Sequence, residues 1–402
     1  MSLCSRSLNK MEIDQVRWSS LFNLIIVFAL FAASCAPSSA VPEQLTPSPE
    51  ITKENDTPTV APTLEAPTES KIPVAEIEAR LAKLVDFVPL AGIAIGIQFK
   101  GETYQQGFGL ADVQNGKPAT AQTVFKIASL TKSFTAAAIL RLSEEGKLGL
   151  EDPISRFLPG TPDLARNIQI QHLLNHTSGF PDMSMDTAQE ALPESFTTAQ
   201  AVEYYFSTVQ NLEFEPGEAS SYSNAGYFLL GAIIENVSGM TYDEYFEKTF
   251  FGPLGLHSSG ECSSQTDLSG YHSVEKNLEA ARSSNLKLLG AAGGLCSSVV
   301  DLLKWMDALA HGKVMQMETW ERMVTPIKLS DGQVLEYGFG LVIEEDSQGL
   351  EISHDGSTAG FNSLLIYYPE HDLIIVLLTN TDGFDPPLRG IASSLASDLV
   401  RE

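Results

Sequence analysis

The sequence predicts an α/β fold of the α+β kind, in which an antiparallel sheet is flanked by N- and C-terminal helices and joined by an all-helical lobe. Two observations lead to this prediction. Strand-like runs occur near both ends of the folded part, at 91–112 and 336–381, whereas about 131–330 consists mostly of helix-like segments broken by Gly and Pro. We therefore expect a sheet assembled from both ends of the chain, with the helical middle as a second lobe.

The elements follow one another in a clear order. Apolar positions in "VAEIEARLAKLVDF" (74–87) recur at helical spacing, which predicts a first helix. "AGIAIGIQFK" and "ETYQQGFGLAD" are typical of strands, and the turn around Gly101 between them indicates an antiparallel hairpin. Four strand-like runs return near the end, and "LRGIASSLASDLV" (388–400) predicts a last helix. No repeat of 20 to 50 residues is evident, which excludes solenoids.

The N-terminus is typical of an exported protein. Residues 1–35 combine basic residues with an apolar stretch too short to span a bilayer comfortably, and they end in a lipobox-like "FAASC" that predicts lipidation of Cys35. Signal cleavage after Ala40 and an uncleaved anchor are the alternatives. Residues 36–73 are rich in Pro, Thr, Ser and Glu, as expected of a disordered linker that tethers the domain at 74–402. Each alternative places this domain outside the cytoplasm, and we expect membrane contact through the lipid anchor only.

Charge and cysteine content narrow the class of protein further. The chain has 402 residues, with 51 acidic and 25 basic side chains and a formal net charge of -26, which repels phosphate backbones and argues against nucleic-acid binding. Cys262 and Cys296 are the two cysteines of the folded part. In an oxidising compartment they can form a disulfide, and two separate buried thiols are the other possibility.

Ser129 and Lys132 form the first candidate catalytic pair. Residues i and i+3 of a helix share one face, so both side chains can meet if a helix starts near Ser129. A serine becomes a nucleophile when a base takes its proton, and a lysine can be that base if its pKa falls. A fall from about 10.4 to about 7.5 corresponds to roughly 4 kcal/mol, which burial would supply. Because S-x-x-K also occurs at Ser7, Ser273 and Ser284, the pattern alone does not decide.

Tyr222 and Asn224 flank a serine just before an apolar helix, in "SSYSNAGYFLLG". Residues i and i+2 of an extended segment project to the same side. A tyrosine can relay a proton, and an asparagine can hold a substrate carbonyl or orient a lysine. Taken alone, the segment is more typical of a helix cap formed by Ser223 or Asn224.

His354, Gly356 and Ser357 end a strand in "ISHDGSTAGFNS". A glycine in a strand lets a ligand come close, and the Ser357 amide could then face an oxyanion together with the amide of Ser129. His354 could donate to a substrate carboxylate or to the tyrosine oxygen. Taken alone, this segment is also typical of a β-bulge with a surface histidine.

Together, the three segments resemble the S-x-x-K, Y-x-N and K-T-G motifs of penicillin-recognising serine enzymes. They are more similar still to the class C β-lactamase-like family, which has Y-x-N and often H-x-G in place of K-T-G. That family also contains esterases, D-aminopeptidases and DD-peptidases. "LLNHTSGF", "GGLCSSVVDLLKW" and "YGFGL" look like segments of it too, and the similarity covers about 74–400.

The resemblance implies a β-lactamase/transpeptidase-like fold and a serine hydrolase. Its expected substrate is a small molecule or peptide with an ester, amide or D-amino-acid peptide bond, and no cofactor is implied. The alternative is a non-catalytic cell-envelope binding or sensor protein with the same fold. The implied roles are Ser129 as acylated nucleophile, Lys132 and Tyr222 as the proton-handling pair, Asn224 as support for substrate and lysine, and His354 with Gly356 lining the cleft.

Two departures from known patterns limit these expectations. His354 and Asp355 stand where antibiotic-binding members have Lys and then Thr or Ser, which weakens a clamp for a β-lactam carboxylate. We therefore expect inefficient hydrolysis of penicillins and cephalosporins. His172 and His176 have a zinc-like spacing but lack the glutamate of a metalloprotease helix, so we expect no metal site. The G-x-S-x-G motif of α/β-hydrolases does not occur.

Overall fold

The computed structural model describes residues 70–193, 195–262, 268–282 and 286–401. The expected signal peptide, Cys35 and most of the expected linker lie outside the described residues. Ile72, which the composition places in the linker, is 3% exposed and packs in an apolar core, so ordered structure begins slightly before residue 74. Within the described residues, no helix is long and apolar enough to cross a membrane.

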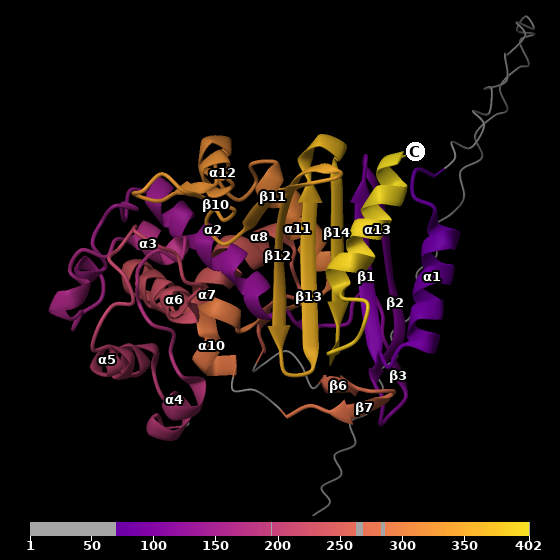
Figure 1. The fold of residues 1–402 in the computed structure, drawn as a ribbon, viewed down its shortest axis with the longest axis horizontal. Coiled ribbons are helices and arrows are strands. Elements are labelled where there is room, and N and C mark those ends of the chain that lie inside the picture. The colour runs from indigo at the N-terminus through magenta and orange to yellow at the C-terminus, as the bar shows by residue number, and fades with distance from the viewer. Residues whose placement is uncertain (1–69, 194, 263–267, 283–285, 402) are drawn as a thin grey trace, which may run out of the picture. The chain divides into compact units, whose positions relative to one another are not determined.

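A seven-stranded antiparallel sheet forms the centre of the domain (Figure 1). Its strand order is β11-β12-β13-β14-β1-β2-β3, so β14 from the C-terminal part pairs directly with β1 from the N-terminal part. This confirms that the sheet is assembled from both ends of the sequence. The strands are β1 (Gly92–Phe99), β2 (Glu102–Asp112), β3 (Lys117–Pro118), β11 (Val342–Asp346), β12 (Gly349–Thr358), β13 (Phe361–Tyr368) and β14 (Leu373–Thr379).

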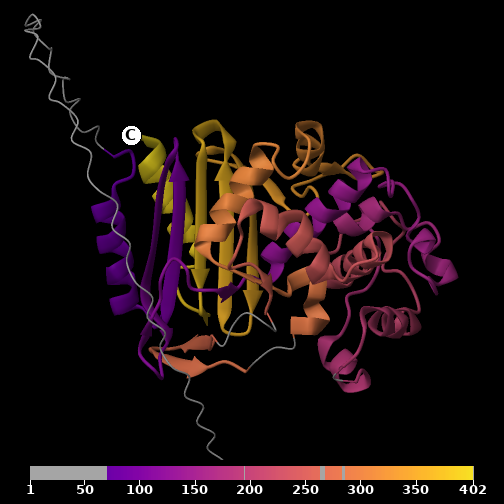
Figure 2. The ribbon, with the colours of Figure 1, turned by 180° about the vertical axis from the view of Figure 1, so that it is seen from behind.

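The two faces of the sheet pack against different helices. Ile93, Ile95 and Ile97 alternate along β1 and share one core with α1 (Val74–Phe87) and α13 (Leu388–Arg401), as predicted. Figure 1 shows α13 in front of this face, and the view from behind (Figure 2) shows the orange helix α11 (Val299–Ala310) across the other. There, a side chain added at Gly96 would lie 2.9 Å from Leu303, so the glycine allows α11 to pack closely against β1.

The hairpin between β1 and β2 turns at Lys100 and Gly101, where the sequence predicts it. Both residues have positive φ, 47° and 84°. A two-residue turn with both φ values positive matches the twist of the strands that it joins. The local sequence therefore determines this hairpin.

The helical lobe contains short strands as well as helices, so the prediction of an all-helical lobe is wrong in detail. These strands are two to four residues long, which is too short to show a periodicity, and several of them pair with segments far away in the sequence. They form the sheets β10 (Val334–Leu335)–β9 (Ile327–Lys328), β15 (Thr381–Asp382)–β6 (Tyr271–Val274)–β7 (Asn277–Ala280) and β4 (Phe125–Lys126)–β8 (Leu295–Ser297)–β5 (Gly260–Glu261). The helices are α2 (Thr131–Glu144), α3 (Ile170–Leu174), α4 (Met185–Ala191), α5 (Thr198–Thr208), α6 (Asn224–Ser238), α7 (Tyr242–Phe246), α8 (Gly252–Leu254), α10 (Leu286–Gly293), α11 and α12 (Met317–Met323).

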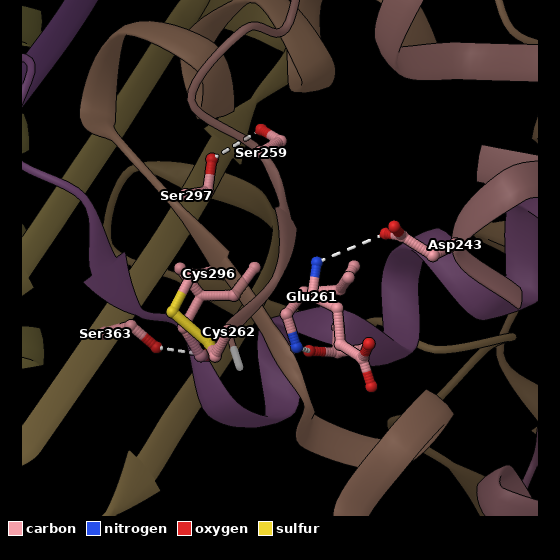
Figure 3. Close-up of a disulfide and its surroundings, with 10 residues drawn as sticks. Asp243, Ser259, Glu261, Cys262, Cys296, Ser297 and Ser363 are labelled. Carbon is pink, nitrogen blue, oxygen red and sulfur yellow. Dashed lines mark hydrogen bonds between the residues drawn. A yellow bond between two sulfur atoms is a disulfide. The ribbon is translucent and has the colours of Figure 1, made fainter. Parts of the chain in front are cut away.

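A disulfide between Cys262 and Cys296 fastens the sheet of β4, β8 and β5 (Figure 3). This resolves the two possibilities that cysteine counting leaves open. Cys296 lies in β8 and Cys262 follows β5, and a hydrogen bond of 2.9 Å between the hydroxyls of Ser259 and Ser297 joins the same two strands. Because β8 also pairs with β4, the disulfide supports the strand that leads to Ser129.

Removing this disulfide is expected to destabilise the domain without abolishing its fold. The two cysteines are 34 residues apart, and cross-linking a loop of this length contributes about 2–4 kcal/mol. We expect the double variant Cys262→Ser, Cys296→Ser to unfold at a lower urea concentration. Reduced wild type should match it, and reduction should leave the variant unchanged. Equal midpoints for oxidised wild type and variant would contradict the prediction.

Candidate active site

Ser129 lies in a strained turn between β4 and α2. It is the middle residue of the single 3₁₀ turn Ala128–Leu130, and Ala128 has a φ of 45°, which is unfavourable for a residue with a side chain. Two hydrogen bonds made by the backbone of Ile127 hold the turn in place. Its amide donates to Leu295 O (3.1 Å), and its carbonyl accepts from Ser363 Oγ (2.7 Å). The sheets on either side therefore fix the backbone that presents the Ser129 side chain.

Lys132 lies one helical turn after Ser129 and is fully buried. Its Nζ is 3.1 Å from Ser129 Oγ, 2.8 Å from Asn224 Oδ1 and 2.7 Å from the carbonyl of Ala292. Burial lowers the pKa of Lys132 to about 7, although the charges of Asp182 and Asp355 oppose this shift. Neutral and protonated lysine therefore coexist near pH 7.

The three partners of Lys132 determine what its neutral form can do. Asn224 Oδ1 and the Ala292 carbonyl only accept hydrogen bonds, so they take both N–H groups of a neutral amine. The remaining lone pair then faces Ser129 Oγ, which has a proton to donate. This geometry fits a lysine that removes the proton of the serine.

Tyr222 lies beside both residues. Its ring centroid is 4.7 Å from Lys132 Nζ, and its hydroxyl is hydrogen-bonded to Ser129. Although 47% of the residue is exposed, burial raises the pKa of Tyr222, and the hydrogen bond to Ser129 opposes the rise. The phenol is thus protonated at neutral pH and can pass on a proton.

The segment before α6 is both a helix cap and part of the site. Ser223 Oγ accepts from the Gly226 amide (3.2 Å), so the capping interpretation is correct for Ser223. Asn224, the first residue of the helix, donates from Nδ2 to Asp182 (3.1 Å), which turns its Oδ1 toward Lys132. Asp182 also accepts from the Ala225 amide (2.8 Å) at the positive end of α6.

Gly356 brings β12 against the turn of Ser129. A side chain built on Gly356 would lie 2.4 Å from the Ile127 carbonyl and 2.9 Å from the Ser129 amide, so only glycine fits there. Ser357 is the next residue of the strand and is exposed. By strand alternation, the side chains of Asp355 and Ser357 point away from the face of His354 and Gly356.

His354 is buried and both of its ring nitrogens have protein partners. Nδ1 lies 2.6 Å from the carbonyl of Asp355, and Nε2 lies 3.2 Å from the hydroxyl of Tyr337. This arrangement differs from a histidine that donates to a substrate carboxylate, because neither nitrogen is left for a ligand. The Tyr337 hydroxyl is also 3.2 Å from Nε2 of His176.

Three residues of this site are not predicted from the sequence: Asp182, His176 and Tyr337. His176 and Tyr337 lie in "LLNHTSGF" and "YGFGL", which resemble family segments but do not by themselves indicate a catalytic role for either residue. His172 is not paired with His176; its Nδ1 accepts from the Gln169 amide (3.2 Å) at the start of α3. Asp182 follows a proline in a loop, and no local pattern distinguishes it.

The family model described as Beta-lactamase matches residues 78–397. Over 297 residues, the chain is 32% identical to penicillin-binding protein 4* of Bacillus subtilis (strain 168), covering 69% of this chain and 65% of that protein. It is 26% identical over 314 residues to D-aminopeptidase of Gluconobacter oxydans (strain 621H), covering 76% of this chain and 59% of that protein. The chain thus spans less than two thirds of the length of either relative.

A solved structure is similar over most of the chain. D-amino acid amidase from Ochrobactrum anthropi SV3, complexed with L-phenylalanine, superimposes with a TM-score of 0.69 and 25% sequence identity. The match covers 81% of this chain and 97% of the amidase. The similarity therefore includes both the sheet and the helical lobe.

Proposed function

This chain belongs to the Beta-lactamase family of serine hydrolases, and we propose that it cleaves an ester, an amide or a D-amino-acid peptide bond through an acyl-enzyme at Ser129. The observation that carries the proposal is the buried Lys132, whose lone pair faces Ser129 Oγ. The similarity to a D-aminopeptidase and to a D-amino acid amidase supports an amide or peptide bond as the target.

Acylation proceeds by proton removal and attack. Neutral Lys132 takes the Ser129 proton, and Oγ forms a bond to the carbonyl carbon of the substrate. The carbonyl oxygen becomes an oxyanion, which the amides of Ser129 and Ser357 stabilise across the close contact at Gly356. When the intermediate collapses, the leaving alcohol or amine takes the proton, relayed by Tyr222, and the acyl group stays on Ser129.

Deacylation repeats these steps with water. Water attacks the acyl carbon while neutral Lys132 takes up its proton, which Tyr222 relays by passing on its own proton as it receives one, and the bond to Oγ breaks. Ser129 regains a proton and the carboxylic acid product leaves. Asn224 keeps Lys132 in place throughout, because Asp182 holds the amide in one orientation.

We propose that substrates with a carboxylate close to the reacting carbonyl are poor ones. The charges that act on Lys132 and Tyr222 are those of Asp182 and Asp355, both exposed carboxylates. They repel a negatively charged group placed beside them. This supports inefficient hydrolysis of penicillins and cephalosporins, which carry such a carboxylate.

A covalent adduct tests the function directly. We expect a p-nitrophenyl ester to give a burst of p-nitrophenol close to one equivalent and an intact mass raised by the acyl group. Peptide mapping should place that group on Ser129. A protein with neither burst nor adduct would instead favour a non-catalytic binding protein with this fold, and an adduct on another residue would contradict Ser129 as the nucleophile.

We also propose that the domain acts outside the cytoplasm, anchored through lipid on Cys35. The N-terminal sequence and the Cys262–Cys296 disulfide support this, since disulfides persist in oxidising compartments. Fractionation of cells that express the full chain and its Cys35→Ser variant tests it. The variant should leave the membrane fraction, and an unchanged distribution would contradict Cys35 as the anchor.

A further inference from the structure

A chain of hydrogen bonds crosses the site beneath the reacting groups. It runs from the Ser223 amide to His176 Nδ1 (3.1 Å), from His176 Nε2 to the Tyr337 hydroxyl (3.2 Å), from that hydroxyl to His354 Nε2 (3.2 Å), and from His354 Nδ1 to the Asp355 carbonyl (2.6 Å). Both ends are backbone groups. One belongs to the segment that carries Tyr222 and Asn224, and the other to β12.

The backbone groups at the two ends of this hydrogen-bond chain determine which atom carries the proton in each of its hydrogen bonds. The Ser223 amide can only donate, so His176 Nδ1 accepts and a neutral His176 carries its proton on Nε2. The Asp355 carbonyl can only accept, so His354 carries its proton on Nδ1 and Nε2 accepts. Tyr337 therefore accepts from His176 and donates to His354. Its hydroxyl also contacts that of Tyr227, whose own proton is donated to the Leu174 carbonyl (2.6 Å).

The surroundings keep both histidines neutral, as this pattern requires. Burial lowers the pKa of His354 to about 4 and holds the pKa of His176 well below its usual value; the charge of Lys132 acts in the same direction on both. Protonated His176 would lose the bond from the Ser223 amide, and protonated His354 would present a second donor to Tyr337. The titratable groups that face His354 are Lys132, His176, Tyr222, Tyr337, Asp355 and Arg389.

Tyr222 depends on this chain for its position. The His176 ring packs on Tyr222 with their centroids 4.4 Å apart, and Tyr222 and the Ser223 amide are adjacent in sequence. At the other end, Asp355 precedes Gly356 and Ser357, which meet the turn of Ser129. The chain thus sets the spacing between the proton-relaying tyrosine and the strand beside the nucleophile.

We propose that Tyr337 is a positioning residue, whose hydroxyl joins His176 and His354 into one directed, neutral hydrogen-bond chain that holds the Tyr222–Asn224 segment against β12. Its catalytic consequence rests on the proposed function, since it acts through Tyr222. Displacing a reacting group slows the reaction, because small errors in geometry raise the activation barrier. A displacement of 1 Å can lower the rate by about 10²-fold.

The test is the Tyr337→Phe variant, which keeps the ring and removes the hydroxyl. With a p-nitrophenyl ester, we expect kcat to fall about 10- to 100-fold with KM changed less than about threefold. Nitrogen NMR of histidine-labelled wild type should show His176 protonated on Nε2 and His354 on Nδ1. In the variant, His354 should begin to titrate at higher pH, because Nε2 has lost the donor that stabilised its neutral form.

Tyr368→Phe is the matched control, since it also removes a tyrosine hydroxyl, one bonded to Glu351 (2.8 Å) on the other face of the sheet. It should keep wild-type kcat and both histidine signals. Three results would each overturn the proposal. They are an equal loss of kcat in the two variants, the opposite protonation of either histidine in wild type, and a kcat of Tyr337→Phe within twofold of wild type. If wild type does not cleave the ester, the proposed function fails for that substrate. The NMR measurement still decides whether the hydrogen-bond chain exists.

Discussion

The Ser129→Ala variant is expected to lose at least about 10³-fold in turnover, because the reaction then has no atom to carry the acyl group. Ser129 Oγ is the hydroxyl that the buried Lys132 faces. Its removal deletes a partly exposed oxygen and no packed group, so the fold should be retained. Steady-state hydrolysis of a p-nitrophenyl ester measures the loss, and thermal unfolding checks that the protein is intact.

Ser273→Ala provides a matched control. Ser273 begins another S-x-x-K sequence but lies in β6, and the lysine of that motif, Lys276, is exposed. Its turnover should equal that of wild type. If Ser129→Ala retained more than a tenth of wild-type turnover, Ser129 would be excluded as the nucleophile.

Lys132→Ala should have the second largest effect, a loss of about 10²–10⁴-fold, which is typical of a removed general base. The active form of Lys132 is neutral, and its pKa in the free protein is about 7, so wild-type kcat/KM should rise with pH through that value. Below pH 7 the amine is protonated and cannot accept the Ser129 proton. The variant should lack this step in its pH profile.

Lys276→Ala is the control for this experiment, since it removes the exposed lysine of the second motif. It should keep both the rate and the pH profile of wild type. A rise through pH 7 that persists unchanged in Lys132→Ala would assign the titrating group to another residue.

Local sequence patterns predicted the parts of this fold that depend on near neighbours. The helix at 74–87 and the turn at Gly101 lie where periodicity and glycine place them. The strands β4, β8 and β5 were not predicted, because each has two or three residues and pairs with a strand that is not its neighbour in the sequence. Such pairing depends on tertiary contacts, so it cannot be predicted from a short segment of the sequence.

The residues of the candidate site also divide into those that local motifs predict and those whose roles depend on distant partners. Ser129, Lys132, Tyr222 and Asn224 belong to motifs, and the structure brings them together. His354 also lies at the site, but its nitrogens bind protein groups that the sequence could not identify as neighbours. Tyr337 and Asp182 come from loops and act through partners far away in the chain, so their roles follow only from three-dimensional distances.

The pairing of β1 with β14 has a consequence for biosynthesis. Thr379 follows Gly92 by 287 residues, yet the two are hydrogen-bonded at one end of the β1–β14 pair. The β1–β2 hairpin leaves the ribosome early and exposes an unpaired, apolar strand edge until β14 has been made. The domain can therefore complete its sheet only after translation has passed residue 379, and a nascent chain stopped before β14 is a natural substrate for chaperones and proteases.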